Sequence, residues 1–199
     1  RALDRINAEA MVFLRSIAEA WRERVADVLV AGMVGPRGDG YRASRATPDE
    51  AAAYHLPQIR ALARGGADLV AAYTLTGVAE AIGIALAAER VGVPCGLAFT
   101  VETDGRLPDG TALAEAIAAV DAVCPPAHFG VNCAHPRHIA AGLAPGDSAL
   151  GRIAVVRANA SELSHAELDE AEELDDGDPL LLAEAVAALR GRLPGLAVV

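Results

Sequence analysis

The chain has 199 residues, of which 53% are apolar and 4% are aromatic, and its formal net charge is −10. This length and composition are typical of one α/β domain whose core is built mainly from Ala, Val and Leu. The negative charge disfavours nucleic acid or an anionic membrane as a partner, because both bind through concentrated Lys and Arg, and it favours a small solute instead.

The cysteines and the N-terminus indicate the compartment. Cys95, Cys124 and Cys133 cannot all pair with one another, and no basic region followed by an apolar run and a cleavage site begins the chain. No segment reaches the roughly 18 uninterrupted apolar residues of a membrane span. The sequence therefore predicts a cytoplasmic protein with reduced thiols and no membrane partner.

The predicted elements begin with a helix over residues 2–24, where apolar side chains recur at helical spacing. Segment 25–33 is nearly all apolar, as expected of a strand that helices cover on both faces. The glycine-rich segment 34–40 that follows is predicted to be a loop. Gly35 and Pro36 would then lie at the rim where this strand ends.

A capping box formed by Thr47 and Glu50 predicts a helix that ends near residue 64, and Pro57 is expected to kink or divide it. Strands and helices then alternate through the middle of the chain. The predicted elements are a strand at 67–74, a helix at 78–90, a strand at 94–101, a loop at 102–109, a helix from Thr111 to about 123 and a strand at 128–133.

The last third of the chain is predicted to hold a strand at 153–158 and a helix at 179–190. Between them, Ser164 opens another capping box within the acidic stretch 162–178, which we interpret as a solvated helix face. A further strand begins at residues 196–199.

Strands that alternate with helices indicate parallel βαβ units, so the fold is either an open doubly wound sheet or a (β/α)₈ barrel. No Gly-rich dinucleotide fingerprint follows the first strand, which lowers the first alternative. The chain starts in a helix with no strand of its own and stops within an apolar strand, and a full barrel needs ~250 residues. We therefore expect an α/β fold in which residues 1–199 form a single (β/α)₈ TIM-type barrel domain. It would be truncated at both ends, with about six of the eight strands in sequential order.

A thiol, an amide and an imidazole are expected together in the loop after the strand at 128–133. Asn132, Cys133 and His135 would lie at the carboxyl edge of the sheet, where α/β folds hold their sites. His135 and His138 resemble a metal-binding pair with Cys133, although this spacing fits capping of a helix that Pro136 begins equally well. Cys133 by itself is compatible with a buried core thiol, and Asn132 with a residue that only orders the loop.

Five segments, in this order, resemble the homocysteine S-methyltransferase family. They are VAGMVGPRGDGY, DLVAAYTLTGVAEAIGIALAA, GLAFTVETDGRLPDGTALAEAI, HFGVNCAHPRH and RANASELSHAELDEAEELDDGDP. The resemblance implies a (β/α)₈ barrel that moves a methyl group onto the homocysteine sulfur, with zinc held by three cysteines. It implies that Cys133, in the GxNC element, is the first zinc ligand, and that a Gly-Gly-Cys-Cys segment expected beyond Val199 supplies the other two. Cys95 and Cys124 would lie at the opposite edge as structural thiols.

The chain departs from the family at one position. Many members have Glu-Thr where this sequence has Tyr73 and Thr74, and that glutamate helps to hold the amino group of homocysteine. A phenol supplies no negative charge at neutral pH, so recognition of the ammonium is expected to weaken or to shift to Glu102 or Asp104, which follow the strand at 94–101. Tyr73 is equally compatible with an ordinary core aromatic, and the two carboxylates with solvated loop charges.

The predicted function is transfer of a methyl group to the zinc-activated thiol of homocysteine, giving methionine. The donor would be a sulfonium or ammonium compound such as S-adenosylmethionine or S-methylmethionine, and a homo-oligomer is compatible with the sequence. The alternatives are a methyltransferase that acts on a different thiol and a barrel that binds a small molecule without turnover. Residues 1–199 alone are expected to carry no zinc at Cys133, because one thiolate cannot replace three protein ligands.

Overall fold

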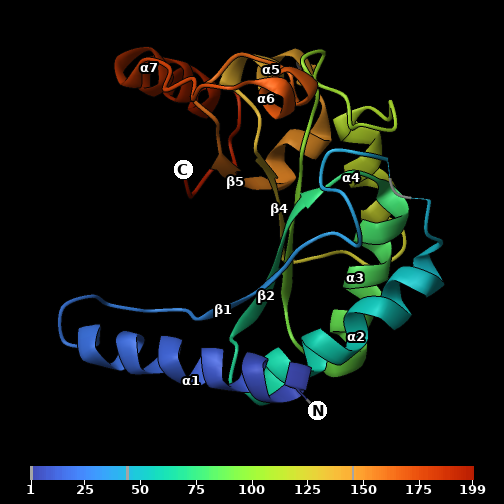
Figure 1. Cartoon of the computed structure of the whole chain (residues 1–199), viewed down its shortest axis with the longest axis vertical. Helices are drawn as coiled ribbons and strands as arrows, with labels where there is room; N and C mark the ends of the chain where they lie inside the picture. The colour runs from blue at the N-terminus through green and yellow to red at the C-terminus, as the bar shows by residue number, and fades with distance from the viewer. Residues whose placement is uncertain (1, 44, 145) are drawn as a thin grey trace.

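Five parallel strands form one sheet in the sequential order β1-β2-β3-β4-β5. The computed structural model describes residues 2–43, 45–144 and 146–199 (Figure 1). The strands are β1 (Ala31–Val34), β2 (Leu69–Leu75), β3 (Cys95–Phe99), β4 (His128–Asn132) and β5 (Ile153–Arg157). Sequential parallel order is consistent with part of a TIM-type barrel. Within the described residues the sheet stays open, so a closed barrel remains a prediction.

The helices follow the strands as βα units. They are α1 (Ala2–Trp21), α2 (Pro48–Arg64), α3 (Val78–Val91), α4 (Leu113–Asp121), α5 (Pro136–Ala141), α6 (His165–Glu170) and α7 (Pro179–Arg190), with a 3₁₀ turn η1 (Ser148–Arg152) before β5. In Figure 1, α2, α3 and α4 lie on one side of the sheet, whereas α5, α6 and α7 gather at the upper end of the view and α1 lies at the lower end. The face of the sheet opposite α2 and α3 is left open in this view.

The core lies between the sheet and the helices α2, α3 and α4. Phe99 and Phe129 stack with their ring centroids 6.2 Å apart, and both are fully buried, as is Ile84. Burial of each such side chain stabilises the fold by about 1.5–3 kcal/mol. Helices α2 and α3 approach closely at Gly83, where an added Cβ would lie 2.5 Å from Cβ of Ala51. The contact therefore excludes any larger residue at Gly83.

The structure confirms both predicted capping boxes. The Thr47 side chain accepts from Glu50 N at the start of α2, and Ser164 does the same for Glu167 N at the start of α6. Pro57 does not divide α2, which is one continuous helix. No helix in the described part of the chain combines the length and the apolarity needed to cross a bilayer.

The first predicted strand is wrong over most of its length. Strand β1 begins only at Ala31, and Val25, Val28 and Leu29 are exposed. An apolar run becomes a strand only where a neighbouring strand can pair with it, and β2 reaches back no further than Leu69, the partner of Ala31. The apolar pattern alone could not show where that pairing stops.

Three further boundaries differ for local reasons. The helix predicted from Thr111 starts at Leu113, because the loop before it closes through an antiparallel bridge between Arg106 and Ala112. The strand predicted at 196–199 is reduced to one parallel bridge from Val198 to β5, so the described residues hold five strands instead of six. In the acidic stretch, residues 171–178 lie outside α6 and are not helical.

Candidate active site

The carboxyl ends of β2 and β4 meet through one amide side chain. Asn132 Oδ1 accepts a hydrogen bond from Thr74 N at 2.8 Å, and Asn132 Nδ2 donates to Thr74 Oγ1 at 2.8 Å and to Cys133 Sγ at 3.1 Å. Thr74 and Cys133 both have positive φ angles, 61° and 54°, which side chains with a Cβ rarely adopt. The amide therefore holds two strained residues against each other, and this positions the sulfur at the rim as predicted for Cys133.

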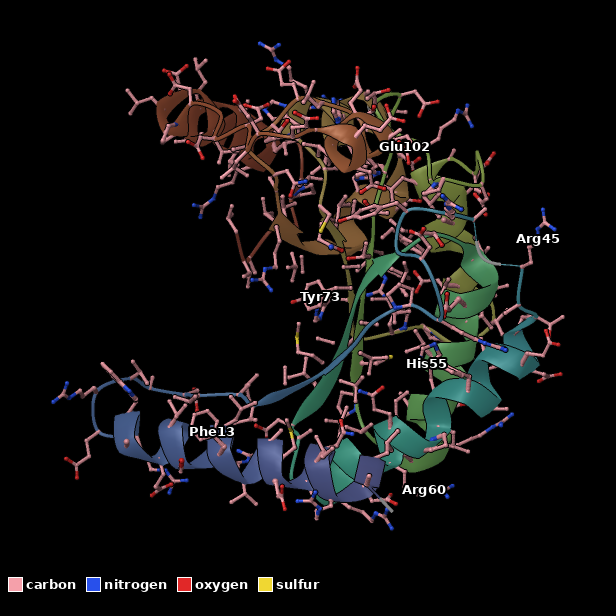
Figure 2. The ribbon with its side chains drawn as sticks, viewed as in Figure 1. Phe13, Arg45, His55, Arg60, Tyr73 and Glu102 are labelled. Carbon is pink, nitrogen blue, oxygen red and sulfur yellow. The ribbon has the colours of Figure 1, made fainter. Side chains whose placement is uncertain are left out.

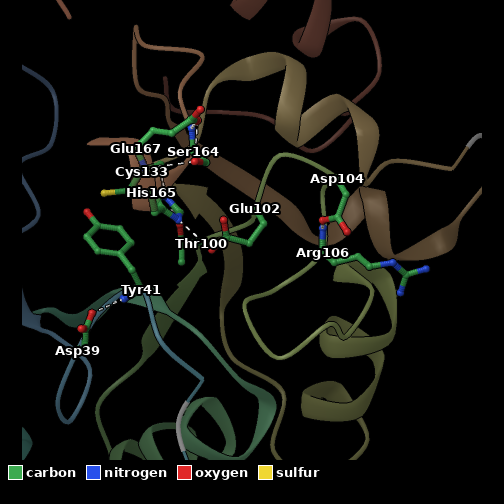
Figure 3. A network of polar contacts seen from close by, with 10 residues as sticks. All are labelled: Asp39, Tyr41, Thr100, Glu102, Asp104, Arg106, Cys133, Ser164, His165 and Glu167. Atoms are coloured by element: carbon green, nitrogen blue, oxygen red, sulfur yellow. Dashed lines mark hydrogen bonds and ion pairs between the residues drawn. The ribbon is translucent and has the colours of Figure 1, made fainter. Parts of the chain in front are cut away.

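The loop after β1 brings a phenol to the same sulfur. The Tyr41 hydroxyl reaches the Cys133 side chain, and the Tyr41 ring lies against the His165 imidazole with the ring centroids 4.3 Å apart (Figure 3). Partial burial, followed by the proximity of Cys133, raises the pKa of the Tyr41 hydroxyl. The phenol therefore keeps its proton beside the sulfur. Sequence reasoning missed Tyr41; the only available signal was its place at the end of a glycine-rich loop.

His165 fixes the backbone of Cys133 from the other side. Its Nε2 lies 2.7 Å from Cys133 O, and its Nδ1 lies 3.1 Å from Glu102 Oε1 (Figure 3). A carbonyl oxygen can only accept, so Nε2 carries a proton and donates it. The contact between Nδ1 and the Glu102 carboxyl group then needs a second proton, held on one of the two residues. Sequence reasoning used this segment only as a capping box and missed His165.

The two predicted carboxylates separate in the structure. Glu102 is half-buried and joins the Cys133 cluster through His165. Asp104 is exposed, accepts from Arg106 N at 3.0 Å and closes the turn after β3 (Figure 3). The structure therefore brings Glu102 to the cluster but leaves Asp104 away from it.

The remaining predicted substrate residues lie on or beside the open face of the sheet. Tyr73 is half-buried on the side opposite α2 and α3 (Figure 2), and the Arg157 guanidinium carbon lies 5.3 Å from its ring centroid. It is therefore not a buried core aromatic. Pro36 packs within the loop that carries Tyr41, whereas Gly35 is exposed and faces open space. A substrate role for these three residues stays a prediction.

The local histidine cluster considered as a metal site is not formed. His135 Nδ1 accepts from Arg137 N and caps α5, as expected of the capping alternative. The His135 and His138 rings lie 5.8 Å apart, and burial lowers the pKa of His135. Among the described residues no three His, Cys, Asp or Glu side chains gather as a metal site. Cys133 fits one zinc ligand, and the set of three thiolates is not completed by these residues.

The other two cysteines lie at the opposite edge of the sheet. Cys95 begins β3 and is buried, and Cys124 is buried in the loop before β4. Burial, with a smaller effect from Cys124, raises the pKa of the Cys95 thiol to about 12. Burial also raises the pKa of Cys124. Both behave as the small hydrophobic residues that the sequence predicted.

A second polar cluster, which sequence reasoning also missed, anchors the Tyr41 loop from behind the sheet. His55 of α2 and Glu80 of α3 are fully buried, and His55 Nε2 lies 2.9 Å from Glu80 Oε1 (His55 is labelled in Figure 2). Arg37 N, in the loop after β1, donates to the same Glu80 oxygen at 2.6 Å. The pair therefore fixes the start of the loop whose end places Tyr41 on Cys133.

Comparison with known proteins identifies relatives of most of the chain. A family model described as homocysteine S-methyltransferase matches residues 1–187. A curated homocysteine S-methyltransferase from Escherichia coli (strain K12) is 32% identical over 149 residues, which cover 67% of this chain and 48% of the relative. Homocysteine S-methyltransferase 3 of Arabidopsis thaliana is 30% identical over 123 residues, which cover 56% of this chain and 35% of that relative. The chain thus spans half or less of the length of these relatives.

Solved structures of a homocysteine methyltransferase from Escherichia coli have a similar fold. Its oxidised form matches with a TM-score of 0.71 and 23% identity, covering 98% of this chain and 64% of that one. Its metallated form matches with a TM-score of 0.63 and 25% identity, and the match covers 80% of this chain and 59% of that one. The first similarity supports the α/β fold alone, and both are compatible with part of a TIM-type barrel.

Proposed function

The chain belongs to the homocysteine S-methyltransferase family, and we propose that the protein transfers a methyl group to the sulfur of homocysteine, giving methionine. The observation that carries this proposal is the placement of the Cys133 sulfur at the carboxyl edge of β4 among the polar side chains of Asn132, Thr74 and Tyr41. A structural thiol needs no such surroundings, as Cys95 illustrates.

We propose zinc as the cofactor and Cys133 as one of its ligands, with the other two thiolates supplied by residues after Val199. A zinc ion held by three thiolates would keep a fourth position in which an acceptor thiol loses its proton. The donor set supports this choice, because a free and half-buried cysteine sulfur at the rim is a soft ligand of the kind that zinc prefers. One of the similar solved structures is described as metallated.

The residues of this chain would orient the sulfur and leave the chemistry to the bound reactants. Asn132 donates to Sγ, the Tyr41 hydroxyl lies beside it, and His165 holds the carbonyl of Cys133. Hydrogen bonds to a metal ligand fix its direction and tune its charge. Glu102 Oε1 faces His165, and we propose that its second oxygen contributes to binding of the amino acid part of the substrate.

The reaction balances as a direct displacement. The acceptor thiolate forms a new bond to the methyl carbon of the donor while the bond from that carbon to the donor sulfur or nitrogen breaks. The leaving group is a neutral thioether or amine, and the thiol proton goes to solvent. S-adenosylmethionine and S-methylmethionine are the donors that we propose, and the cytoplasm is the compartment that we propose.

The test is methyl transfer by the full-length protein supplied with zinc. Homocysteine is incubated with each donor, and methionine is measured by mass spectrometry. Methionine should form with at least one donor, and Cys95→Ala should retain this activity as a control at the opposite edge of the sheet. If the zinc-loaded protein binds thiols but methylates none of them, the non-catalytic binding barrel is the correct function.

A further inference from the structure

We propose that the open face of the sheet beside Cys133 holds a carboxylate-binding subsite whose anion-binding group is Arg157. The acceptor thiol would be recognised mainly through its carboxylate, and any contact of a substrate ammonium with Glu102 would contribute little. This inference rests on the proposed methyl transfer to a thiol and specifies the class of thiol.

The backbone places Arg157 next to the reactive sulfur. Arg157 is the last residue of β5, its register partner on β4 is Asn132, and its carbonyl oxygen accepts from Cys133 N at 3.0 Å. A group bound by the Arg157 side chain would therefore lie within a few bonds of a thiol held at Cys133.

The Arg157 side chain reaches across the open face of the sheet. Its guanidinium carbon lies 5.3 Å from the ring centroid of Tyr73 on β2, although β3 and β4 separate these strands. Strands three steps apart are roughly 14 Å apart in a flat sheet, so the two side chains must meet over the face itself. The phenol ring lies against the guanidinium, and within the described residues no hydrogen bond or ion pair occupies its N–H groups.

No carboxylate in the described residues neutralises this cation. Arg157 is exposed and has no ion pair within the described ranges, a property that it shares with other arginines such as Arg60 and Arg90; its place beside Cys133 distinguishes it from them. A hollow that Tyr73 lines is bordered also by Ala98, His128 and Val155 among other residues, and by no Asp or Glu. Burial, followed by the proximity of Arg152, lowers the pKa of His128, so this imidazole is neutral at pH 7.

These observations favour an anion over a cation at this face. A guanidinium binds a carboxylate through two parallel N–H groups, and Tyr73 adds a neutral phenol that can also donate. An ammonium at the same place would meet a like charge without a compensating carboxylate. The chemical class of acceptor is therefore a short thiol that carries a carboxylate a few carbons from its sulfur.

Three thiols of matched chain length separate the two recognition groups. Homocysteine has both a carboxylate and an ammonium, 4-mercaptobutanoate has only the carboxylate, and 3-mercaptopropylamine has only the amine. For the full-length zinc-loaded protein, we expect kcat/KM for 4-mercaptobutanoate to lie within about threefold of that for homocysteine. For 3-mercaptopropylamine it should be lower by about tenfold or more, the usual loss when a charged hydrogen-bond partner is removed.

Arg157→Gln assigns the effect to the residue. KM for the two carboxylates should rise by about tenfold to a hundredfold with kcat nearly unchanged, and values for the amine should not change. Arg157→Lys, which keeps the charge but not the planar fork, should recover part of the loss. Arg190→Gln changes an exposed arginine on α7 in the same way and serves as the matched control, with no expected effect.

Several outcomes would overturn the inference. If 3-mercaptopropylamine is methylated as well as homocysteine, or if Arg157→Gln reduces activity equally for all three thiols, Arg157 is not a carboxylate subsite although the proposed function stands. If no thiol is methylated, calorimetry with 4-mercaptobutanoate decides: binding that Arg157→Gln abolishes supports the subsite without the methyl transfer, and no binding overturns both.

Discussion

The two edges of the sheet each hold a cysteine, in opposite surroundings. At the amino edge, Cys95 is enclosed by apolar side chains, and burial raises the pKa of its thiol to about 12. At the carboxyl edge, Cys133 is half-buried and in contact with an amide, a hydroxyl and a phenol. The direction of the strand, and not the residue type, therefore decides which thiol is available for chemistry. At the carboxyl edge the chain leaves the sheet in loops that can carry polar side chains to the sulfur.

The largest expected effect tests the comparison directly. In the full-length protein, Cys133→Ser should abolish zinc retention and lower methyl transfer by more than about a hundredfold, because a ligand contributes more than the groups around it. Metal analysis and product formation are the measurements, and circular dichroism checks that the fold remains. Wild-type zinc content in this variant would show that Cys133 is not a ligand.

Alkylation compares the reactivity of the Cys95 and Cys133 thiols without any activity assay. After removal of metal with a chelator, iodoacetamide at pH 8 should label Cys133 and leave Cys95 unmodified. With a pKa of about 12, only about one Cys95 thiol in 10⁴ is ionised at this pH, and burial blocks access as well. Mass spectrometry gives the sites, and the unfolded protein, in which all cysteines should react, is the control. Comparable alkylation rates of Cys133 and Cys95 in the folded protein would show that the two thiols do not differ in reactivity.

A smaller effect is expected from the buried pair that holds the Tyr41 loop. Glu80→Gln should lower the free energy of unfolding by about 1–3 kcal/mol, because it weakens the contacts to Arg37 N and to His55 in a fully buried site. Urea unfolding measures this loss. Glu89→Gln, on an exposed position of α3, is the matched control and should change it by less than about 0.5 kcal/mol.

Glu80→Gln also tests whether the buried Glu80 affects the exposure of Cys133 at the carboxyl edge of the sheet. If Glu80 positions the loop, Glu80→Gln should also increase the alkylation rate of Cys133, because Tyr41 would cover the sulfur less often. An unchanged alkylation rate together with lower stability would mean that the pair stabilises the helices without positioning the loop.

The smallest effect is expected at Tyr41. Tyr41→Phe removes the hydroxyl beside the sulfur and should lower kcat by about threefold to tenfold, the size expected for the loss of one polar contact. Because burial and Cys133 raise the pKa of Tyr41, the phenol keeps its proton below this raised value and loses it only as the pH rises through it. The pH profiles of the two proteins should therefore run parallel up to pH 10. A difference that appears at lower pH would show that Tyr41 titrates during catalysis.

Much of this fold follows from local sequence patterns. The capping boxes at Thr47 and Ser164 and the place of Cys133 after β4 could be predicted, because each depends on residues close together in the chain. The sequential strand order followed from the alternation of strands and helices. The first strand was placed too early, since pairing with β2 decides where β1 begins.

The candidate site was predicted only in part, for a different reason. Asn132 and Thr74 were expected at the rim, and the structure joins them, because both follow directly from the ends of parallel strands. Tyr41 and His165 reach Cys133 from distant loops, and the path of a loop depends on tertiary contacts such as the one between Arg37 N and Glu80. No periodicity or motif encodes such a contact.

The hydrogen bonds of Asn132 make the site sensitive to deamidation of this residue. Its side chain must accept on one atom, from Thr74 N, and donate on the other, to Thr74 Oγ1 and Cys133 Sγ. Aspartate has the same shape but no donor when ionised, and it would place a negative charge where the sulfur now finds an N–H group. Loss of a single ammonia molecule from this amide would therefore change the site more than most substitutions of its neighbours, with almost no change in volume.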